Sequence, residues 1–338
     1  MNRIFCFGEL LLRLSPELGG KWLTESVMPV YIGGAELNTA TALAKWNVPV
    51  SYSTVLPDNY LSKEICNELN KKNINTDQLI FGGKRIGSYY LPQGADLKNA
   101  GVIYDRAYSS FSELQPGQID WDAVLNNVSW FHFSAVSPAL NEDVAAVCKE
   151  AVDAASKKGI RISVDLNYRS KLWQYGKKPK EIMTALVAYC DVVMGNIWSA
   201  DELLGISTDA DIHHKKSKAN YLEHARRTAE NLMRNFPACK SVANTFRFDD
   251  GDTTSYYAAL DTNDRQFISQ EFSTNKVVDK IGSGDCFMAG LIYGFYNKLD
   301  FQEIIDFATI AAFNKLFIMG DATTSTVEEI KKTHFNDA

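Results

Sequence analysis

The order of apolar segments along the chain constrains its fold more than any other feature. Short, continuous apolar runs, such as RIFCF at 3–7 and IRISVDLN at 160–167, alternate with longer segments whose apolar residues recur at helical spacing, such as 141–159. Parallel strands need a crossover that is usually a helix, and a strand that is apolar on both faces must be covered on both. The alternation therefore predicts an α/β protein with a mostly parallel sheet between two helical layers.

Two β-rich stretches interrupt this alternation. Residues 81–111 include GSYYLPQGADLKNAGVIYDRAYSSF, which has strand-like alternation, several glycines and no helical spacing, and residues 11–31 have a similar texture. Segments of this kind can pair into a small separate sheet. We expect a single domain, residues 1–338, in which about 11–31 and 82–110 form this small sheet.

Composition excludes several classes of protein. The 338 residues carry a net charge of -6 and no basic stripe, so we expect no nucleic-acid partner. The six cysteines form no C-x-x-C pair and have no histidine cluster beside them, which indicates reduced core thiols rather than a zinc site. The sequence contains neither a signal peptide nor a stretch long enough to cross a membrane, so we expect a cytoplasmic protein without a membrane partner.

The segment DKIGSGDCFMAGLIYGFY, residues 279–296, joins a glycine-containing turn to a strongly apolar helix. The first backbone N–H groups of a helix lack partners within the helix and carry the positive end of its dipole. Glycines allow the backbone to approach a ligand closely. The segment therefore predicts an anion site formed by the amides of Gly282, Ser283 and Gly284, with Asp285 beside it.

Two roles are open for Asp285 on these grounds. Aspartate is a favoured N-cap, so the residue could simply cap the apolar helix. Alternatively, its carboxylate could accept the proton of a hydroxyl that attacks phosphorus, while the amides stabilise the transferring phosphoryl group. The dinucleotide fingerprint G-x-G-x-x-G is absent after the first strand, and no G-x-x-x-x-G-K-[ST] loop occurs, so neither a Rossmann dehydrogenase nor a P-loop enzyme is favoured.

The motifs identify a family. DKIGSGDCFMAGLI resembles the C-terminal signature of the ribokinase-like (phosphofructokinase-B) carbohydrate kinases, and GGAELNTATALAKW, residues 33–46, resembles their N-terminal signature about 250 residues earlier. The resemblance implies a three-layer αβα fold with a β-sheet lid. It also implies ATP-dependent sugar phosphorylation with Asp285 as the base. Mg²⁺ would be bound with ATP rather than directly by the protein, and a monovalent cation is a further possibility.

Three segments are most similar to the branch of this family that phosphorylates 2-keto-3-deoxygluconate. They are GGAELN, VIYDRAYS at 102–109 and DLNYRSKLW at 165–173. This implies transfer of the ATP γ-phosphate to the 6-hydroxyl of 2-keto-3-deoxygluconate, giving 2-keto-3-deoxy-6-phosphogluconate. A fructokinase, a 2-keto-3-deoxygalactonate kinase and a non-catalytic relative that binds sugar acids are the alternatives.

The resemblance also implies a set of site residues. A sugar acid carries a carboxylate, which arginine can bind bidentately, although Arg106 and Arg169 could each form structural ion pairs instead. The expected substrate-binding residues are Gly34, Glu36, Asn38, Tyr90, Tyr104, Arg106, Asn167, Arg169 and Asp285. The expected nucleotide-binding residues are Asn196, Thr245, Arg247, Gly282, Gly284 and Asn314.

Three places differ from the family pattern, and one of them is ANTFRFDDGD, residues 243–252, where the family usually reads T-L-G or K-R-G. Lys280 and Ile281 replace the residues that usually follow the first aspartate of the C-terminal motif, and the family's N-x-x-E appears as NIWS, with Ser199 at its last position. Glu202 lies three residues further on. The edges of the small sheet are candidates for pairing with a second copy, so we expect a homo-oligomer.

Overall fold

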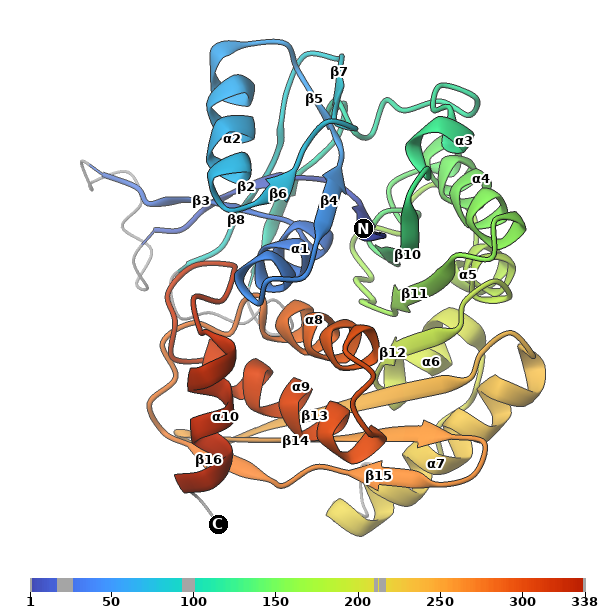
Figure 1. Ribbon diagram of the computed structural model, residues 1–338, viewed down its shortest axis with the longest axis vertical. Coiled ribbons are helices and arrows are strands. Elements are labelled where there is room, and N and C mark those ends of the chain that lie inside the picture. The colour runs from blue at the N-terminus through green and yellow to red at the C-terminus, as the bar shows by residue number, and fades with distance from the viewer. Residues whose placement is uncertain (1, 17–26, 93–100, 210–211, 213–216, 337–338) are drawn as a thin grey trace.

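The computed structural model describes residues 2–16, 27–92, 101–209, 212 and 217–336 (Figure 1). Within these residues the central sheet has ten strands. Their spatial order is β15 (Gln266–Ile268), β14 (Thr253–Thr262), β13 (Ser241–Asp250), β12 (Val192–Gly195), β11 (Arg161–Asp165), β10 (Val128–Ser134), β1 (Arg3–Phe7), β4 (Val50–Ser53) and β6 (Ile74–Asn75), while β16 (Phe272–Thr274) pairs with β14.

Parallel pairing joins the strands from β6 to β13, whereas β14, β15 and β16 are antiparallel additions at the other edge. Strand β1 shows why the apolar runs are continuous: Ile4 and Cys6 enter the core on one face, and Phe5 and Phe7 enter the core on the other. Because side chains of a strand alternate between faces, a strand covered on both sides must be apolar at every position. The predicted mostly parallel sheet is confirmed.

Helices cover both faces of this sheet (Figure 1). One layer consists of α1 (Ala35–Lys45), α2 (Tyr60–Lys71), α8 (Ser283–Tyr296), α9 (Phe301–Lys315) and α10 (Val327–Asn336). The other consists of α3 (Trp121–Val124), α4 (Glu142–Lys157), α5 (Pro179–Val187), α6 (Ile197–Leu204) and α7 (Lys218–Asn235). The three-layer αβα architecture is as predicted. Among the described residues, no helix has both the length and the apolarity needed to cross a membrane.

Residues 50–57 contain two short strands that belong to different sheets. After β4 the chain leaves the central sheet, and β5 (Val55–Leu56) pairs with β7 (Ile80–Phe81) instead. Residues 241–250 form the ten-residue β13, which makes a long antiparallel hairpin with β14. Local sequence could not reveal this length, because the last residues of β13 are polar and project beyond the core.

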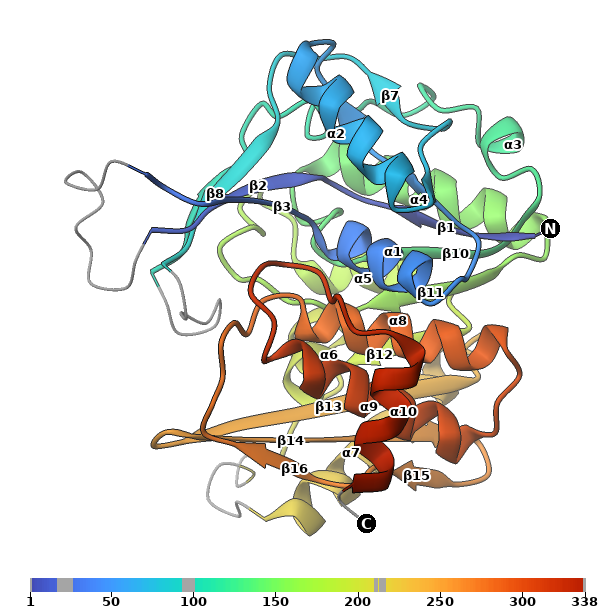
Figure 2. The same cartoon turned by 60° about the vertical axis from the view of Figure 1, so that its left-hand side comes forward.

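A separate four-stranded sheet, called here the small sheet, has the order β3 (Val30–Gly33), β2 (Leu11–Leu14), β8 (Gly87–Tyr90) and β9 (Ile103–Asp105). It extends from the main body beside α1 (Figure 2). It comes from the two β-rich stretches, of which residues 17–26 and 93–100 lie outside the described part. One row across its inner face is Tyr31, Arg13, Tyr89 and Tyr104, and the neighbouring row on its outer face is Val30, Leu14, Tyr90 and Ile103.

The turn before α8 requires glycine at one position. Gly282 is the N-cap of α8 and has a φ of 76°, in the left-handed region. A Cβ atom at this residue would also lie 1.7 Å from the backbone oxygen of Asp321. Any other side chain would therefore be strained and would displace a neighbouring backbone segment. The turn before α8 is therefore packed directly against the backbone of Asp321.

Candidate active site

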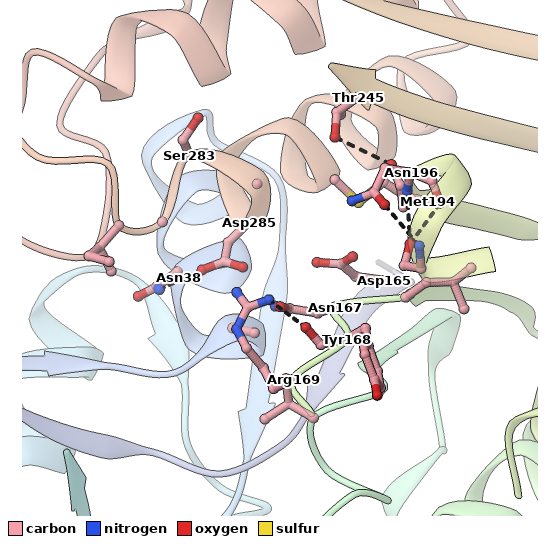
Figure 3. Close-up of a pocket in the computed structure, with 18 of the residues that line it drawn as sticks. Asn38, Asp165, Asn167, Tyr168, Arg169, Met194, Asn196, Thr245, Ser283 and Asp285 are labelled. Carbon is pink, nitrogen blue, oxygen red and sulfur yellow. Dashed lines mark hydrogen bonds between the residues drawn. The ribbon is translucent and has the colours of Figure 1, made fainter. Parts of the chain in front are cut away.

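The N-termini of α1 and α8 meet beside the carboxyl ends of the central strands. Asn38, in the first turn of α1, donates a hydrogen bond from Nδ2 to Oδ2 of Asp285 over 2.7 Å. Thr39 Oγ1 donates to the backbone carbonyl of the same aspartate over 3.2 Å. The two sequence motifs, 247 residues apart at this contact, are therefore parts of one site (Figure 3).

Asp285 is the third residue of α8, not its cap. The N-cap is Gly282, and no side chain caps this helix end, so the capping interpretation of Asp285 is wrong. The carboxyl group is buried, and burial raises its pKa to about 6. The hydrogen bond from Asn38 and the positive charge of Arg169 lower the pKa, while the negative charge of Asp321 raises it. The carboxylate is therefore ionised at neutral pH and remains basic.

The backbone amides at the start of α8 face open space. Among the described residues, none accepts a hydrogen bond from the N–H groups of Ser283, Gly284 or Asp285. A Cβ atom added to Gly284 would meet only the methyl group of Met194, at 4.0 Å. These free donors at the positive end of a buried helix form the arrangement that binds phosphate and other anions.

This end of α8 lines a cavity of about 510 Å³. It lies where β11 and β12 end, which is the usual position of ligand sites in open α/β sheets. Residues of the small sheet, α1, β11, β12, β13 and α8 contribute to its wall. The predicted site residues that line it are Gly34, Asn38, Tyr104, Arg106, Asn167, Arg169, Asn196, Thr245, Arg247, Gly282, Ser283, Gly284 and Asp285.

The two arginines differ in what they contact. Arg169 points toward Asp285 in the cavity, and within the described part of the chain its side chain donates one hydrogen bond, from Nη1 to the backbone carbonyl of Tyr168 at 2.9 Å (Figure 3). Arg106 is 5% exposed, and its Nε and Nη2 both lie 2.6 Å from Oε2 of Glu9. The structure therefore places an ion pair at Arg106, whereas the guanidinium of Arg169 faces the cavity near Asp285.

The aromatic residue that faces the cavity from β8 is Tyr89, not Tyr90. Side chains alternate across a strand, and the register puts Tyr89 beside Tyr104 on the inner face of the small sheet. The two rings are 6.3 Å apart, and both line the cavity. Tyr90 lies on the outer face, so the structure does not bring this predicted residue into the site.

Glu36 and Asn314 also lie away from the cavity wall. Glu36 is buried beneath α1, where Oε1 accepts hydrogen bonds from the backbone N–H of Ser134 at 2.8 Å and from its hydroxyl at 2.6 Å. Burial raises the pKa of Glu36 to about 7. Asn314 donates from Nδ2 to Thr333 Oγ1 at 3.2 Å, which ties α9 to α10. Both residues support neighbouring elements in this structure.

Several residues that were expected to bind the nucleotide form hydrogen bonds within the protein. Asn196 and Ser199 form a capping box at the start of α6, which explains how serine can replace the family's glutamate without loosening the helix. Thr245 Oγ1 donates to the carbonyl of Gly195 at 3.3 Å. Lys280 pairs with Asp249 over 2.8 Å and also lines the cavity. These expected nucleotide-binding side chains are therefore held by hydrogen bonds and an ion pair within the protein.

Sequence reasoning missed Asp165, the last residue of β11. Its carboxyl group is buried, lies at the cavity wall and points toward the centre of the cavity (Figure 3). Burial and the nearby charge of Asp285 raise its pKa well above the usual value, and Arg169 opposes this shift. An aspartate that ends a buried strand just before an Asn and an Arg is a detectable signal, because strand ends define the site in parallel sheets.

Comparison with known proteins agrees with this geometry. Residues 1–316 match the family model for pfkB family carbohydrate kinases. The crystal structure of 2-dehydro-3-deoxygluconokinase from Thermotoga maritima superposes with a TM-score of 0.90 at 32% identity, covering 99% of this chain and 100% of that one. A 2-dehydro-3-deoxygalactonokinase from Haloferax volcanii is 26% identical over 326 residues, which is 96% of this chain and 94% of the relative.

An E. coli protein solved in complex with ATP and Mg²⁺ shares the fold, with a TM-score of 0.79 at 17% identity over 99% of each chain. The fold and the site together define a sugar kinase. The chain belongs to the pfkB family of carbohydrate kinases. Kinases of this family and fold use ATP with Mg²⁺.

The residues present fit ATP and Mg²⁺. The free amides of α8 suit the phosphates, and Lys280 and Arg247 add positive charge at the same cavity. Oxygen-bearing side chains of Asp165, Asn196 and Glu202 line it as well, and Mg²⁺ prefers oxygen ligands together with substrate phosphates. When bound, the ion would neutralise charge that develops on the phosphate oxygens.

Proposed function

We propose that this chain phosphorylates the 6-hydroxyl of 2-keto-3-deoxygluconate with ATP. The observation that carries the proposal is the position of Asp285, a buried carboxylate with a pKa of about 6 beside the free amides of α8 and the guanidinium of Arg169. The name of the T. maritima structure, which is 32% identical, supports the same substrate. A base, an anion site and a cation for the acid group are the three elements that this reaction needs.

In this proposal, Asp285 accepts the proton of the 6-hydroxyl as the hydroxyl oxygen attacks the γ-phosphorus of ATP. The bond between the γ-phosphorus and the β,γ-bridging oxygen breaks, and ADP leaves. The amides of Ser283 and Gly284, at the N-cap formed by Gly282, hold the transferring phosphoryl group and stabilise its charge. Asn38 keeps the carboxylate oriented and favours its ionised form through their 2.7 Å hydrogen bond. Positioning and charge stabilisation account for most of the catalysis in phosphoryl transfer.

Arg169 supplies the preference for an acid over a neutral sugar. Its guanidinium has donors that can bind a carboxylate in a bidentate manner, and it lies across the cavity from the proposed base. Arg106 contributes less in this proposal, because Glu9 already occupies two of its nitrogen atoms. Tyr89 and Tyr104 form the wall of the small sheet against which the sugar would pack, and the small sheet acts as the lid.

The experiment is an ATP-coupled assay with 2-keto-3-deoxygluconate, 2-keto-3-deoxygalactonate, gluconate, fructose and ribose. The proposal expects the highest kcat/KM for 2-keto-3-deoxygluconate. A higher kcat/KM for fructose or ribose than for both keto acids would contradict it, because a neutral sugar does not use Arg169.

The second candidate is the 4-epimer, 2-keto-3-deoxygalactonate. The H. volcanii relative, 26% identical over nearly the whole chain, bears the name of a kinase for that sugar acid. Both epimers would present the same carboxylate and the same 6-hydroxyl to the site. The ratio of the two kcat/KM values in the same assay decides between them.

We also infer that two copies associate through the outer face of the small sheet. Val30 and Ile103, at the two ends of its outer row, are 54% and 53% exposed, and Leu14 and Tyr90 lie between them in register. An apolar row across a whole sheet face is typical of an interface between protein molecules. Sedimentation of the wild type and of a Val30→Asp, Ile103→Asp variant tests this, and equal masses for the two proteins would contradict it.

A further inference from the structure

A buried cluster of charges lies directly behind the anion site. Arg13 of β2 is 1% exposed, and its Nη2 donates to Oδ2 of Asp279 at 2.7 Å. Its Nε lies 2.7 Å from Oδ1 of Asp321, at an angle outside hydrogen-bond geometry, so that contact is an ion pair alone. Both aspartates are buried as well. One arginine therefore joins the small sheet to two segments that border the cavity.

Asp279 holds these segments by their backbones. Its Oδ1 accepts a hydrogen bond from the N–H of Ile281 at 3.0 Å, and its Oδ2 accepts one from the N–H of Gly320 at 3.2 Å. The first contact closes the turn that leads into Gly282 and α8. The second contact binds that turn to the segment that follows α9. The orientation of Asp279 thus determines the path of the backbone just before the free amides.

Asp321 connects the same turn to the small sheet. Its Oδ2 accepts a hydrogen bond from the hydroxyl of Tyr89 at 3.0 Å, and Tyr89 lines the cavity. A Cβ atom at Gly33 would lie 2.1 Å from this carboxylate, and a Cβ atom at Gly282 would lie 1.7 Å from the backbone oxygen of Asp321. Asp321 is therefore enclosed by the small sheet on one side and by the turn of α8 on the other.

The charges of the cluster also matter for the ligand. Two buried carboxylates behind a phosphate site would repel the phosphate and each other unless a cation is present. Arg13 is the cation that contacts both. Lys315 is buried nearby, donates to the carbonyl of Ile318 at 2.9 Å, and has a pKa lowered by burial. Without Arg13, Asp279 and Asp321 would lose the cation that contacts both of them.

We propose that Arg13 is a positioning residue for phosphoryl transfer. It holds the turn at Asp279–Gly282 so that the α8 amides face the phosphate, and it links this turn to the sheet that carries Tyr89. This inference rests on the proposed role of the 282–284 amides as the anion site. Arg13 is not among the residues that line the cavity, so it acts through Asp279 and Asp321 rather than on the substrates.

The test compares Arg13→Ala and Arg13→Lys with the wild type. Arg226→Ala is the matched control, because Arg226 lies 3.5 Å from the buried Asp261 on the far side of the sheet, away from the cavity. Each variant is assayed below its melting temperature with 2-keto-3-deoxygluconate and ATP·Mg²⁺. The measured quantities are kcat, both KM values, Tm, and the ratio of ATP hydrolysed to sugar phosphorylated.

Arg13→Ala is expected to lower kcat on the order of 100-fold, since small misplacements of catalytic groups cost about this much. The ratio of ATP hydrolysed to sugar phosphorylated is expected to rise, because Arg13 no longer joins the small sheet, which carries Tyr89, to the turn before the α8 amides. Added guanidinium chloride at millimolar concentration should restore part of kcat. Arg13→Lys keeps the charge, but a lysine cannot contact Asp279 and Asp321 through two separate nitrogen atoms. Its kcat should therefore lie between those of the wild type and Arg13→Ala.

Arg226→Ala should lower Tm without changing kcat or the hydrolysis ratio. If the Arg13 variants likewise lower Tm alone, with wild-type kcat and ratio at a temperature where they are folded, Arg13 is merely structural and the inference is overturned. If Arg13→Ala does not fold, Arg13→Lys decides by the same criteria. Failure of the proposed function gives a different result, since the wild type itself would then not phosphorylate the keto acid.

Discussion

The side-chain amide of Asn38 donates a 2.7 Å hydrogen bond to the carboxylate of Asp285, and this contact joins the first turns of two helices from opposite ends of the chain. The bond constrains the orientation of the carboxylate and stabilises its charged form against the cost of burial. Burial raises the pKa of Asp285 to about 6, so the carboxylate is basic but still ionised at neutral pH. It lines the cavity together with the free amides of α8. The proposed base and the proposed anion site therefore lie side by side in one cavity.

Replacing Asp285 with Asn should remove the base while leaving the shape of the site intact. We expect kcat to fall about 10²- to 10⁴-fold, the usual contribution of general base catalysis, with a much smaller change in the KM for the sugar. Steady-state kinetics measures both. Asp300→Asn, at the exposed N-cap of α9, is the matched control and should leave kcat unchanged. Activity that survives Asp285→Asn would remove this residue from the reaction.

Replacing Asn38 with Leu should move the acidic limb of the pH profile to higher pH. In the wild type, kcat/KM should fall as the pH drops through about 6, where Asp285 becomes protonated. The hydrogen bond from Asn38 lowers this pKa, so its loss raises the pKa and leaves less ionised base at pH 6. We expect a roughly tenfold loss at pH 6 that shrinks at pH 8.

The control for that pH profile is Thr39→Val. Thr39 donates to the backbone carbonyl of Asp285 and does not touch the carboxylate, so the acidic limb should keep its position. Equal shifts in the two variants would show that the limb reports a general disturbance of α1 rather than the hydrogen bond to the base.

Replacing Arg169 with Ala should weaken binding of the acid selectively. A hydrogen-bonded contact to a charged group contributes about 1.5 to 3 kcal/mol, so KM for 2-keto-3-deoxygluconate should rise about 10- to 100-fold. For fructose, which lacks a carboxylate, the change should be small. The ratio of the two KM values in wild type and variant measures the effect. Equal losses for both sugars would mean that Arg169 is structural.

Replacing Glu9 with Gln should destabilise the fold, because it leaves the guanidinium of Arg106 buried without its counter-ion. Removal of one partner from a buried ion pair costs about 3 to 5 kcal/mol. Urea unfolding measures the change. Asp58→Asn breaks the exposed pair with Lys63 and should cost less than about 1 kcal/mol. A loss of similar size in the two variants would contradict the structural role of the Glu9–Arg106 pair.

Much of the fold and part of the site could be predicted from the chain because the signals are local. The continuous apolar run at 3–7 indicates a strand that is buried on both faces. The glycines before Asp285 indicate a tight turn, because only glycine adopts positive φ without strain. The long hairpin of β13 and β14 could not be predicted in this way, since its polar tip lies beyond the core and carries no periodic pattern.

The sequence by itself determined the layered architecture, and it predicted the glycine turn and the aspartate that serve as the proposed anion site and the proposed base. Only the tertiary structure decided which side chains reach the cavity. A one-residue change of strand position reverses the direction of a side chain, so Tyr89 rather than Tyr90 faces inward. The roles of the two arginines also depend on residues distant in sequence. Glu9 forms an ion pair with Arg106, whereas Arg169 and Asp165 point into the cavity around Asp285. Such contacts depend on the folded arrangement and cannot be read from a local sequence pattern.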